Sequence, residues 1–202
     1  KVSSFCLDIE GHEFDSIELF GTYQYERGVV SRSPLRYGSA GQCSRKGAGG
    51  HHGNPFFAVC SHNADENSGE AYGFNLVYSG NYKNEIEVDE RGNTRIVSGV
   101  SDDRFEYPLL PGESFYSPEA VLVYSADGLG GISRRMHDFV RAEIINPEFV
   151  SKHRPVVLNT WEGCYFDVDE NKLLAMADGA LEMGAELLVL DDGWFRSNDT
   201  EG

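Results

Sequence analysis

The sequence predicts a mixed fold, in which an antiparallel β-sandwich is followed by the first part of a parallel α/β structure. Three observations lead to this prediction. The first 125 residues hold several short runs of aromatic and β-branched residues, each bounded by turn residues. An amphipathic segment follows. After it come two short apolar runs that flank a helical pattern. These patterns predict a sandwich domain at 1–127, a linker helix within 128–152, and an α/β domain at 153–202.

Several strands are expected in the first domain, and the clearest two form a hairpin between residues 84 and 100. Ile86 and Val88 alternate with acidic residues, and a turn at 91–93 leads into the return strand. Further strands are expected at 16–28, 54–62, 70–82 and 120–125. No convincing helix separates them, which favours antiparallel sheets packed as a sandwich.

The linker region predicts one amphipathic helix from about residue 130 to residue 145. Its apolar side chains recur in steps of four, three, one and four, which places them on one helical face, while basic residues occupy the other side. The residues of the apolar face are Ile132, Met136, Phe139, Val140 and Ile144. Pro147 follows shortly after the expected end, where a helix stop is typical.

The C-terminal part of the sequence predicts a βαβ unit. Two apolar runs, 155–159 and 186–190, flank a helical pattern that begins near Asp167 or Asp169 and ends at Gly184. Such strands are typical of a parallel sheet that is covered on both faces. One unit alone would leave an open edge, and a closed (β/α)8 barrel needs roughly 250 residues. We therefore expect the start of a (β/α)8 (TIM) barrel within a longer chain. The alternative is that these strands join the sheet of the sandwich.

The composition limits the partners and the compartment. The chain has 33 acidic and 17 basic residues and a formal net charge of −16, which argues against nucleic acid and against an anionic membrane surface. It contains no apolar run of the roughly 18 residues that a membrane span needs. The cysteines form no C-x-x-C pair, so we favour buried free thiols over two disulfides and expect a reducing, cytoplasmic compartment. They are Cys6, Cys43, Cys60 and Cys164.

Polar and aromatic side chains follow both strands of the predicted βαβ unit. The end of the first strand carries Asn159, Trp161, Glu162, Cys164 and Tyr165, and the end of the second carries Asp191, Asp192 and Trp194. In parallel sheets, functional residues collect at the carboxyl ends of the strands. Carboxylates accept pairs of hydroxyl hydrogen bonds, and an indole face packs against a sugar ring. The set therefore predicts a sugar-binding site.

Each of these residues also has a plainer interpretation. Asp-Asp-Gly after a strand is an ordinary turn, in which Asp side chains accept hydrogen bonds from backbone N–H groups. Trp194 is more typical of a core position, and Glu162 is expected to have no direct role. Asp191 and Asp192 are not expected to be the catalytic pair of a retaining glycosidase. Such a pair flanks the scissile bond about 5–5.5 Å apart, whereas adjacent strand residues point to opposite faces. We therefore assign both to binding.

The Gly-rich stretch 47–53 is the other candidate for special chemistry. It lacks the Gly-Lys-Ser/Thr ending of a phosphate-binding loop, and no helix is expected after it. Within it, His51 and His52 stand side by side without a carboxylate at the spacing that a zinc site needs. We therefore expect neither a metal ion nor a cofactor.

Four stretches of the sequence resemble glycoside hydrolase family 36, the α-galactosidases of bacterial type. LNTWEGCYFDVDENKLL looks like the first barrel strand and helix of this family, and LLVLDDGWF looks like its second barrel strand. SRKGAGGHHGNPFFAV and GFNLVYSGN look like parts of its N-terminal β-domain. The resemblance covers nearly the whole chain, and the stretches stand in the order that the family has.

The resemblance implies an N-terminal β-supersandwich domain, a (β/α)8 catalytic barrel and a C-terminal β-domain. It implies a retaining glycoside hydrolase that forms homo-oligomers and removes terminal α-D-galactose from oligosaccharides such as melibiose and raffinose. Carried over by motif, Asp191, Asp192 and Trp161 would bind galactose. The nucleophile and the acid/base of the family lie on later barrel strands, beyond residue 202. The chain alone is therefore expected to be inactive.

Two alternatives stay open at this point. The stretches RKGAGGHH and TWEGC depart from the commoner family forms, and they leave the exact glycan open. An α-N-acetylgalactosaminidase on the same scaffold is therefore one alternative. The other is a non-catalytic β-module that binds carbohydrate or mediates oligomerisation.

Overall fold

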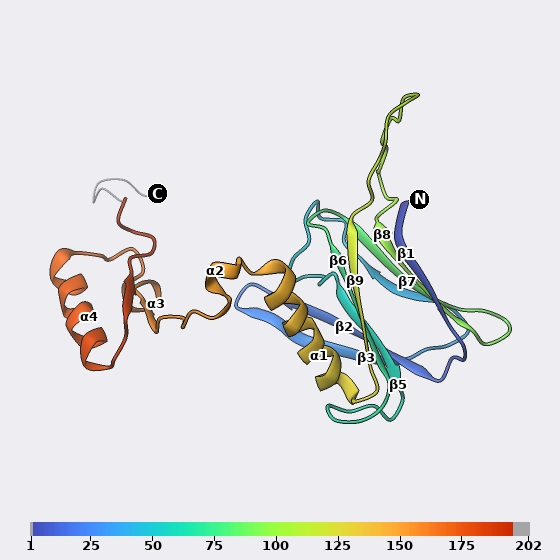
Figure 1. Ribbon diagram of the computed structural model, residues 1–202. Coiled ribbons are helices and arrows are strands. Elements are labelled where there is room, and N and C mark those ends of the chain that lie inside the picture. The colour runs from blue at the N-terminus through green and yellow to red at the C-terminus, as the bar shows by residue number, and fades with distance from the viewer. Residues whose placement is uncertain (1, 196–202) are drawn as a thin grey trace. The chain divides into compact units, whose positions relative to one another are not determined.

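The structure is a computed structural model that describes residues 2–195 of the chain (Figure 1). The chain divides into two compact units, 1–144 and 145–202. In the described residues the first unit contains two antiparallel β-sheets and a helix, and the second contains a parallel βαβ motif. The predicted domain boundaries after residues 127 and 152 stay predictions.

The first unit is the predicted sandwich of antiparallel sheets. One sheet has the strand order β1 (Val2–Ile9), β8 (Thr94–Val100), β7 (Tyr82–Val88) and β4 (Gly38–Cys43). The other has the order β3 (Tyr25–Pro34), β2 (Phe14–Thr22), β5 (Phe56–Ser61), β6 (Ala71–Val77) and β9 (Glu119–Ser125). Neighbouring strands are antiparallel throughout both sheets. The predicted hairpin is β7–β8, and its turn uses Gly92 at a φ of +80°.

An apolar core between the two sheets holds the sandwich together. Phe57 and Phe74 of the five-stranded sheet stack at 4.9 Å between ring centroids, and Phe74 also stacks at 5.5 Å on Phe5 of the other sheet. The buried residues of this core include Phe14, Phe57, Val59, Phe74, Ile86, Val88 and Ile96. Alternate residues of β7 point into the core, as expected for a strand with one buried face.

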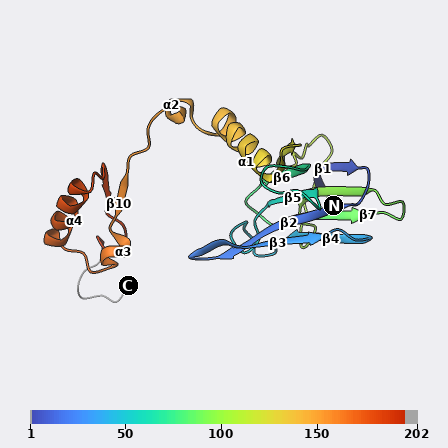
Figure 2. The same ribbon diagram turned by 90° about the horizontal axis from the view of Figure 1, so that it is seen from below.

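Helix α1 (Gly128–Phe139) packs against β9 and β6 of the five-stranded sheet (Figure 1 and Figure 2). Ile132 is buried there in a second apolar cluster, which is separate from the core between the sheets. Gly131 allows the close approach, because a Cβ at this position would lie 1.9 Å from the Ser125 Oγ. The predicted helix is thus confirmed. Its continuation η1 (Val140–Ile144) is a π-helix, and Val140 and Ile144 are exposed, so the predicted apolar face is covered mainly in its first turns.

The second unit contains the predicted βαβ motif. Strands β10 (Val157–Asn159) and β11 (Leu187–Val189) pair in parallel, with Val157 opposite Leu187, and α4 (Glu170–Glu182) lies between them in sequence. Asp169 caps α4, because its side chain accepts a hydrogen bond from the Lys172 N–H at 2.9 Å. Two short helices, α2 (Pro147–Val150) and α3 (Trp161–Cys164), complete this unit. The parallel pairing is that of the predicted barrel start, and it does not extend the sandwich sheets.

Much of the apolar surface of the βαβ motif is open in the described residues. Leu181 is 77% exposed and Leu174 is 58% exposed on α4, and Leu187 is 46% exposed on β11. The strand pair is therefore not buried on both faces in the described residues. Its apolar sequences are typical of strands that are buried on both faces. This surface is available to further elements of a barrel.

Two sequence-based expectations concern the cysteines and the membrane. All four cysteines are free, but the expectation that they are buried holds for Cys60 alone; Cys6 and Cys43 are exposed and Cys164 is partly exposed. A scattered cysteine pattern says nothing about which face of a strand carries the thiol, and β1 and β4 place these two outward. Among the helices of residues 2–195, none is long and apolar enough to cross a membrane.

Candidate functional site

The carboxyl ends of β10 and β11 bring the predicted sugar-site residues to one edge of the strand pair. Asn159 lies opposite Val189 in the parallel register, so the residues that follow each strand emerge side by side. The Asn159 side-chain amide donates a hydrogen bond to the Asp191 carboxylate, with 2.8 Å between Nδ2 and Oδ2. This bond joins the two strand ends directly.

Thr160 fixes the backbone beneath this contact. It is fully buried, and its N–H donates to the Val189 carbonyl at 3.0 Å. Its Oγ1 accepts a hydrogen bond from the Asp191 N–H at 3.1 Å. This hydrogen bond satisfies the Asp191 N–H, which would cost free energy if it were left without an acceptor. Thr160 therefore sets where the chain leaves β11 and where Asp191 begins its turn.

The Asp191 carboxylate is held at both of its oxygens. Oδ2 accepts from Asn159, and Oδ1 accepts from the Asp192 N–H at 2.8 Å. The hydrogen bond from the Asn159 amide, with that from the Asp192 N–H, lowers the pKa of Asp191 below its ordinary value. Asp191 is therefore ionised at neutral pH, and each oxygen keeps a further lone pair that can accept a hydroxyl donor.

The Asp192 side chain is exposed and extends from the same turn. In residues 2–195, the hydrogen bonds of the site do not involve its carboxylate. The turn combines both interpretations of Asp-Asp-Gly: Asp191 accepts a backbone hydrogen bond, as in an ordinary turn, and both carboxylates still face solvent in part.

Trp161 is positioned by its backbone and by two aromatic rings. Its N–H donates to the Asn159 Oδ1 at 2.8 Å, and its indole meets the rings of Tyr165 and Phe166 edge-on, at 5.2 and 5.0 Å between centroids. Trp161 is partly exposed, so its indole has surface left for a ligand. The structure thus brings Asp191 and Trp161 into one network through Asn159.

Glu162 and Trp194 lie next to these residues, and neither belongs to the hydrogen-bond network of Asp191 in the described residues. Glu162 accepts a hydrogen bond from the Tyr165 hydroxyl at 3.3 Å, and its expected lack of a direct role stays a prediction. Trp194 is 68% exposed in the described residues and packs edge-on against Phe195, so the interpretation of Trp194 as a core residue is wrong here. It lines a hollow with residues of α4 that does not include Asp191, Asp192 or Trp161.

The sequence places Asn159 at the end of the first strand but gives it no role, and it does not indicate Thr160 as part of the site. Asn159 is the last residue of an apolar run and Thr160 follows it, and their contacts depend on the register between β10 and β11. The signal that could have found them is position: polar residues at the carboxyl end of one parallel strand face those at the end of its neighbour.

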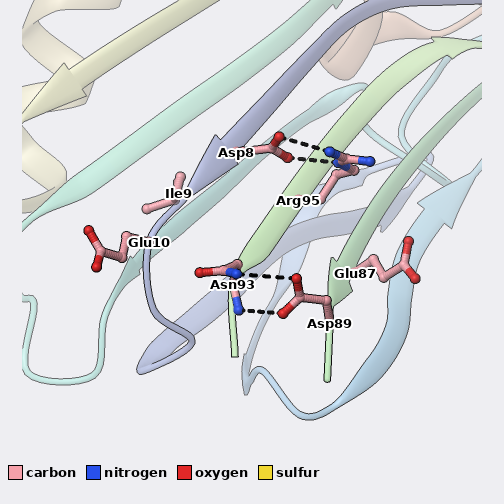
Figure 3. A pocket seen from close by; sticks show the side chains of 7 residues that line it. All are labelled: Asp8, Ile9, Glu10, Glu87, Asp89, Asn93 and Arg95. Atoms are coloured by element: carbon pink, nitrogen blue, oxygen red, sulfur yellow. Dashed lines mark hydrogen bonds and ion pairs between the residues drawn. The ribbon is translucent and has the colours of Figure 1, made fainter. Parts of the chain in front are cut away.

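A second hollow lies on the sandwich, beside β1, β7 and β8, and Figure 3 shows it. It is lined largely by charged side chains, and four of the lining residues bond to one another in two pairs. Asp8 forms two hydrogen bonds with Arg95, at 2.7 and 2.9 Å, and Asp89 binds the side chain and the N–H of Asn93. The Arg95 guanidinium lowers the pKa of Asp8. Among the described residues, no group of three or more His, Cys, Asp or Glu side chains could hold a metal ion.

The chain matches two protein-family models, which together cover nearly its whole length. Residues 1–110 match the family model of the glycosyl hydrolase family 36 N-terminal domain, and residues 114–202 match the Melibiase family model. These two matches place the chain in the class of glycosyl hydrolases. The chain belongs to glycosyl hydrolase family 36.

The relatives are named α-galactosidases. The chain is 43% identical over 201 residues to alpha-galactosidase AgaA of Geobacillus stearothermophilus, which covers 100% of this chain and 27% of the relative. It is 42% identical to alpha-galactosidase 2 of Hypocrea jecorina over 96% of this chain and 26% of the relative. The chain therefore spans about a quarter of the length of these relatives.

Solved structures show the same fold. The crystal structure of AgaA has a TM-score of 0.91 and 43% identity, and the match covers 99% of this chain and 28% of that chain. A variant of AgaA solved in complex with raffinose also has a TM-score of 0.91, at 42% identity and the same coverage. A third AgaA structure contains stachyose, with a TM-score of 0.91 and 43% identity over 98% of this chain and 28% of that chain.

Proposed function

We propose that the whole protein is a retaining α-galactosidase, which removes terminal α-D-galactose from oligosaccharides such as melibiose and raffinose. The observation that carries this proposal is the ionised Asp191 carboxylate, held at both oxygens beside Trp161 at the carboxyl ends of two parallel strands. The names of the relatives and the raffinose and stachyose complexes of AgaA support it.

In this proposal, residues 153–202 form the start of the (β/α)8 catalytic barrel and contribute one wall of the galactose subsite. Asp191 and Asp192 accept hydrogen bonds from hydroxyl groups of the sugar, and Trp161 packs against an apolar face of the ring. Neither aspartate breaks the glycosidic bond. The nucleophile and the acid/base belong to later barrel strands, so this chain by itself holds no catalytic residue.

We also propose that the whole protein is a homo-oligomer in the cytoplasm. The connection 101–118 between β8 and β9 supports the homo-oligomer, since this connection extends beyond the sheets (Figure 1). It exposes apolar side chains, with Tyr116 at 88% and Leu110 at 62% exposure. Exposed apolar patches of this kind are typical of surfaces that contact another protein. The two alternatives, N-acetylgalactosamine as the sugar and a non-catalytic module, gain no support from the names of the relatives.

The test is the hydrolysis of nitrophenyl α-galactoside by the whole protein, with the β-galactoside and the α-N-acetylgalactosaminide as comparison substrates. Asp191→Ala and Asp192→Ala should each lower kcat/KM by about 100-fold or more, because each removes charge-assisted hydrogen bonds of roughly 1.5–3 kcal/mol. Asp178→Ala, an exposed position on α4, is the control and should leave kcat/KM unchanged. The assignment fails if both site variants keep the wild-type value.

A further inference from the structure

A single side chain connects the two predicted sugar contacts. The Asn159 amide donates from Nδ2 to the Asp191 Oδ2 at 2.8 Å, and its Oδ1 accepts from the Trp161 N–H at 2.8 Å. The two partners come from different strand ends, after β11 and after β10. A shift of either one is therefore transmitted to the other through one rigid amide plane.

The two partners also decide which way the amide faces. The Trp161 N–H can only donate, so it requires the oxygen of Asn159, and the ionised Asp191 can only accept, so it requires the NH2 group. Asn supplies both functions at the required length. Asp would keep the acceptor for Trp161 but would turn a carboxylate toward Asp191. Ser would keep a weaker acceptor for Trp161 and would not reach Asp191.

We infer that Asn159 is the positioning residue of the galactose subsite: it holds the Asp191 carboxylate and the Trp161 backbone in one fixed arrangement without itself binding the sugar. This inference rests on the function proposed above. A carboxylate fixed at both oxygens presents its remaining lone pairs in set directions, so the hydroxyl groups of galactose meet acceptors that are already oriented. Among the described residues, the Asp192 N–H is the other hydrogen-bond donor to the Asp191 carboxylate, and it would remain if Asn159 were replaced.

The chain offers a matched control for this contact. In the β7–β8 turn, the Asn93 Nδ2 donates to the Asp89 Oδ2 at 3.2 Å, which is the same pair of groups in the sandwich unit (Figure 3). Asn93→Asp therefore introduces the same chemical change, one carboxylate facing another, outside the proposed subsite. Any general effect of an Asn to Asp change on charge or folding is common to both variants.

The experiment compares the whole protein with its Asn159→Asp, Asn159→Ser, Asn93→Asp and Asp191→Ala variants. The readouts are kcat and KM on nitrophenyl α-galactoside, the inhibition constant of free galactose, and the pH dependence of kcat/KM. Circular dichroism and the thermal midpoint check that each variant folds. In the described residues, the other ionisable side chains on these two segments include Asp192 on the same turn and Glu162, Cys164 and Tyr165 after β10, and all variants keep them.

Asn159→Ser should lower kcat/KM by about 10-fold and weaken galactose inhibition in parallel, since it removes one charge-assisted hydrogen bond from Asp191. Asn159→Asp should lower kcat/KM by about 100-fold at neutral pH or below, because facing carboxylates share a proton. The acid limb of its pH profile should move to higher pH. Asn93→Asp should change kcat/KM by less than about 2-fold.

The outcomes separate the inference from the proposed function. The proposed function stands if the wild type hydrolyses the α-galactoside and Asp191→Ala does not. The positioning role is overturned if, in that case, folded Asn159→Ser and Asn159→Asp keep the wild-type kcat/KM, the wild-type inhibition by galactose and the wild-type acid limb of the pH profile. If the wild type hydrolyses no α-galactoside, the proposed function fails and the inference fails with it. If Asn159→Asp does not fold, Asn159→Ser alone decides.

Discussion

The backbone of Gly193 lies directly against that of Tyr165. A Cβ on Gly193 would come 3.2 Å from the Tyr165 carbonyl oxygen and 3.1 Å from the Phe166 Cα. Gly193 has a φ of +103° and Tyr165 a φ of +49°, so each segment that follows a strand of the parallel pair contains a residue with a positive φ at this contact. The turn that carries both aspartates therefore packs closely against the backbone of Tyr165 and Phe166, whose rings contact Trp161.

Gly193→Ala should destabilise this contact and weaken sugar binding. An L-residue at this φ is strained, and its Cβ would meet backbone atoms that cannot move independently, so we expect a loss of about 1–3 kcal/mol in stability. The KM for an α-galactoside should rise, because the turn that carries Asp191 and Asp192 must shift. Thermal unfolding and steady-state kinetics measure the two effects.

Gly179→Ala is the control for this change. Gly179 lies in α4, and a Cβ there would have nothing within 4 Å. Alanine in a helix interior should therefore be neutral or stabilising by up to about 1 kcal/mol. Equal effects of the two substitutions would show that the contact between Gly193 and Tyr165 contributes nothing.

Thr160→Val should lower both stability and activity. Valine has the shape of threonine but lacks the Oγ1 that accepts the Asp191 N–H, so a donor is left without its partner at a cost of about 1–3 kcal/mol. Thr160→Ser keeps the oxygen and should retain most of the activity. The measurement is kcat/KM with the thermal midpoint of each variant. A valine variant with more activity than the serine variant would contradict this role of the hydroxyl.

Asp15 makes the stability of the sandwich depend on pH. Its carboxylate accepts a hydrogen bond from Arg32 Nε at 2.6 Å and lies 2.6 Å from His62 Nδ1. Burial opposes ionisation of Asp15, but the hydrogen bonds from Arg32 and His62 outweigh it, so the pKa of Asp15 is lowered. Because the folded-state pKa lies below the unfolded one, the stabilisation is present above about pH 3.9 and is lost as the pH falls through the folded-state value.

Asp15→Asn should therefore lower the thermal midpoint at pH 7, and the difference from the wild type should shrink as the pH falls below about 4. Asp8→Asn is the matched control, since Asp8 also pairs with an arginine, but both partners are more than half exposed. Its effect at pH 7 should be smaller, because exposed ion pairs contribute little. A difference between Asp15→Asn and wild type that stays constant from pH 7 to pH 3 would rule out this linkage.

The elements with strong hydrophobic periodicity could be predicted from the sequence. In the β7–β8 hairpin, β7 alternates strictly and the turn contains Gly92, and α1 and α4 have helical spacing and end signals. β4 could not be found in this way, since its sequence GSAGQC contains no β-branched or aromatic residue. It forms because β7 pairs with it along its whole length.

The site could be predicted as a set of residues but not as a network. The position of Asp191, Asp192 and Trp161 after apolar strands indicated one polar edge, because parallel strands end together. The bonds from Asn159 and Thr160 depend on the register that sets Val157 opposite Leu187, and an apolar run without alternation does not determine a register. The exposure of Trp194 likewise depends on tertiary packing and not on local pattern.

The two units differ in how much of their apolar surface they bury by themselves. This difference affects the order in which they fold during synthesis. The core between the sheets is formed by residues up to Ile96, and the cluster under α1 is completed by Ile132. All of these leave the ribosome before β10 does. The βαβ motif instead leaves Leu181 and Leu174 open. We therefore expect the sandwich to fold cotranslationally on its own, while the nascent barrel start stays dependent on later strands and is the segment that chaperones protect from aggregation.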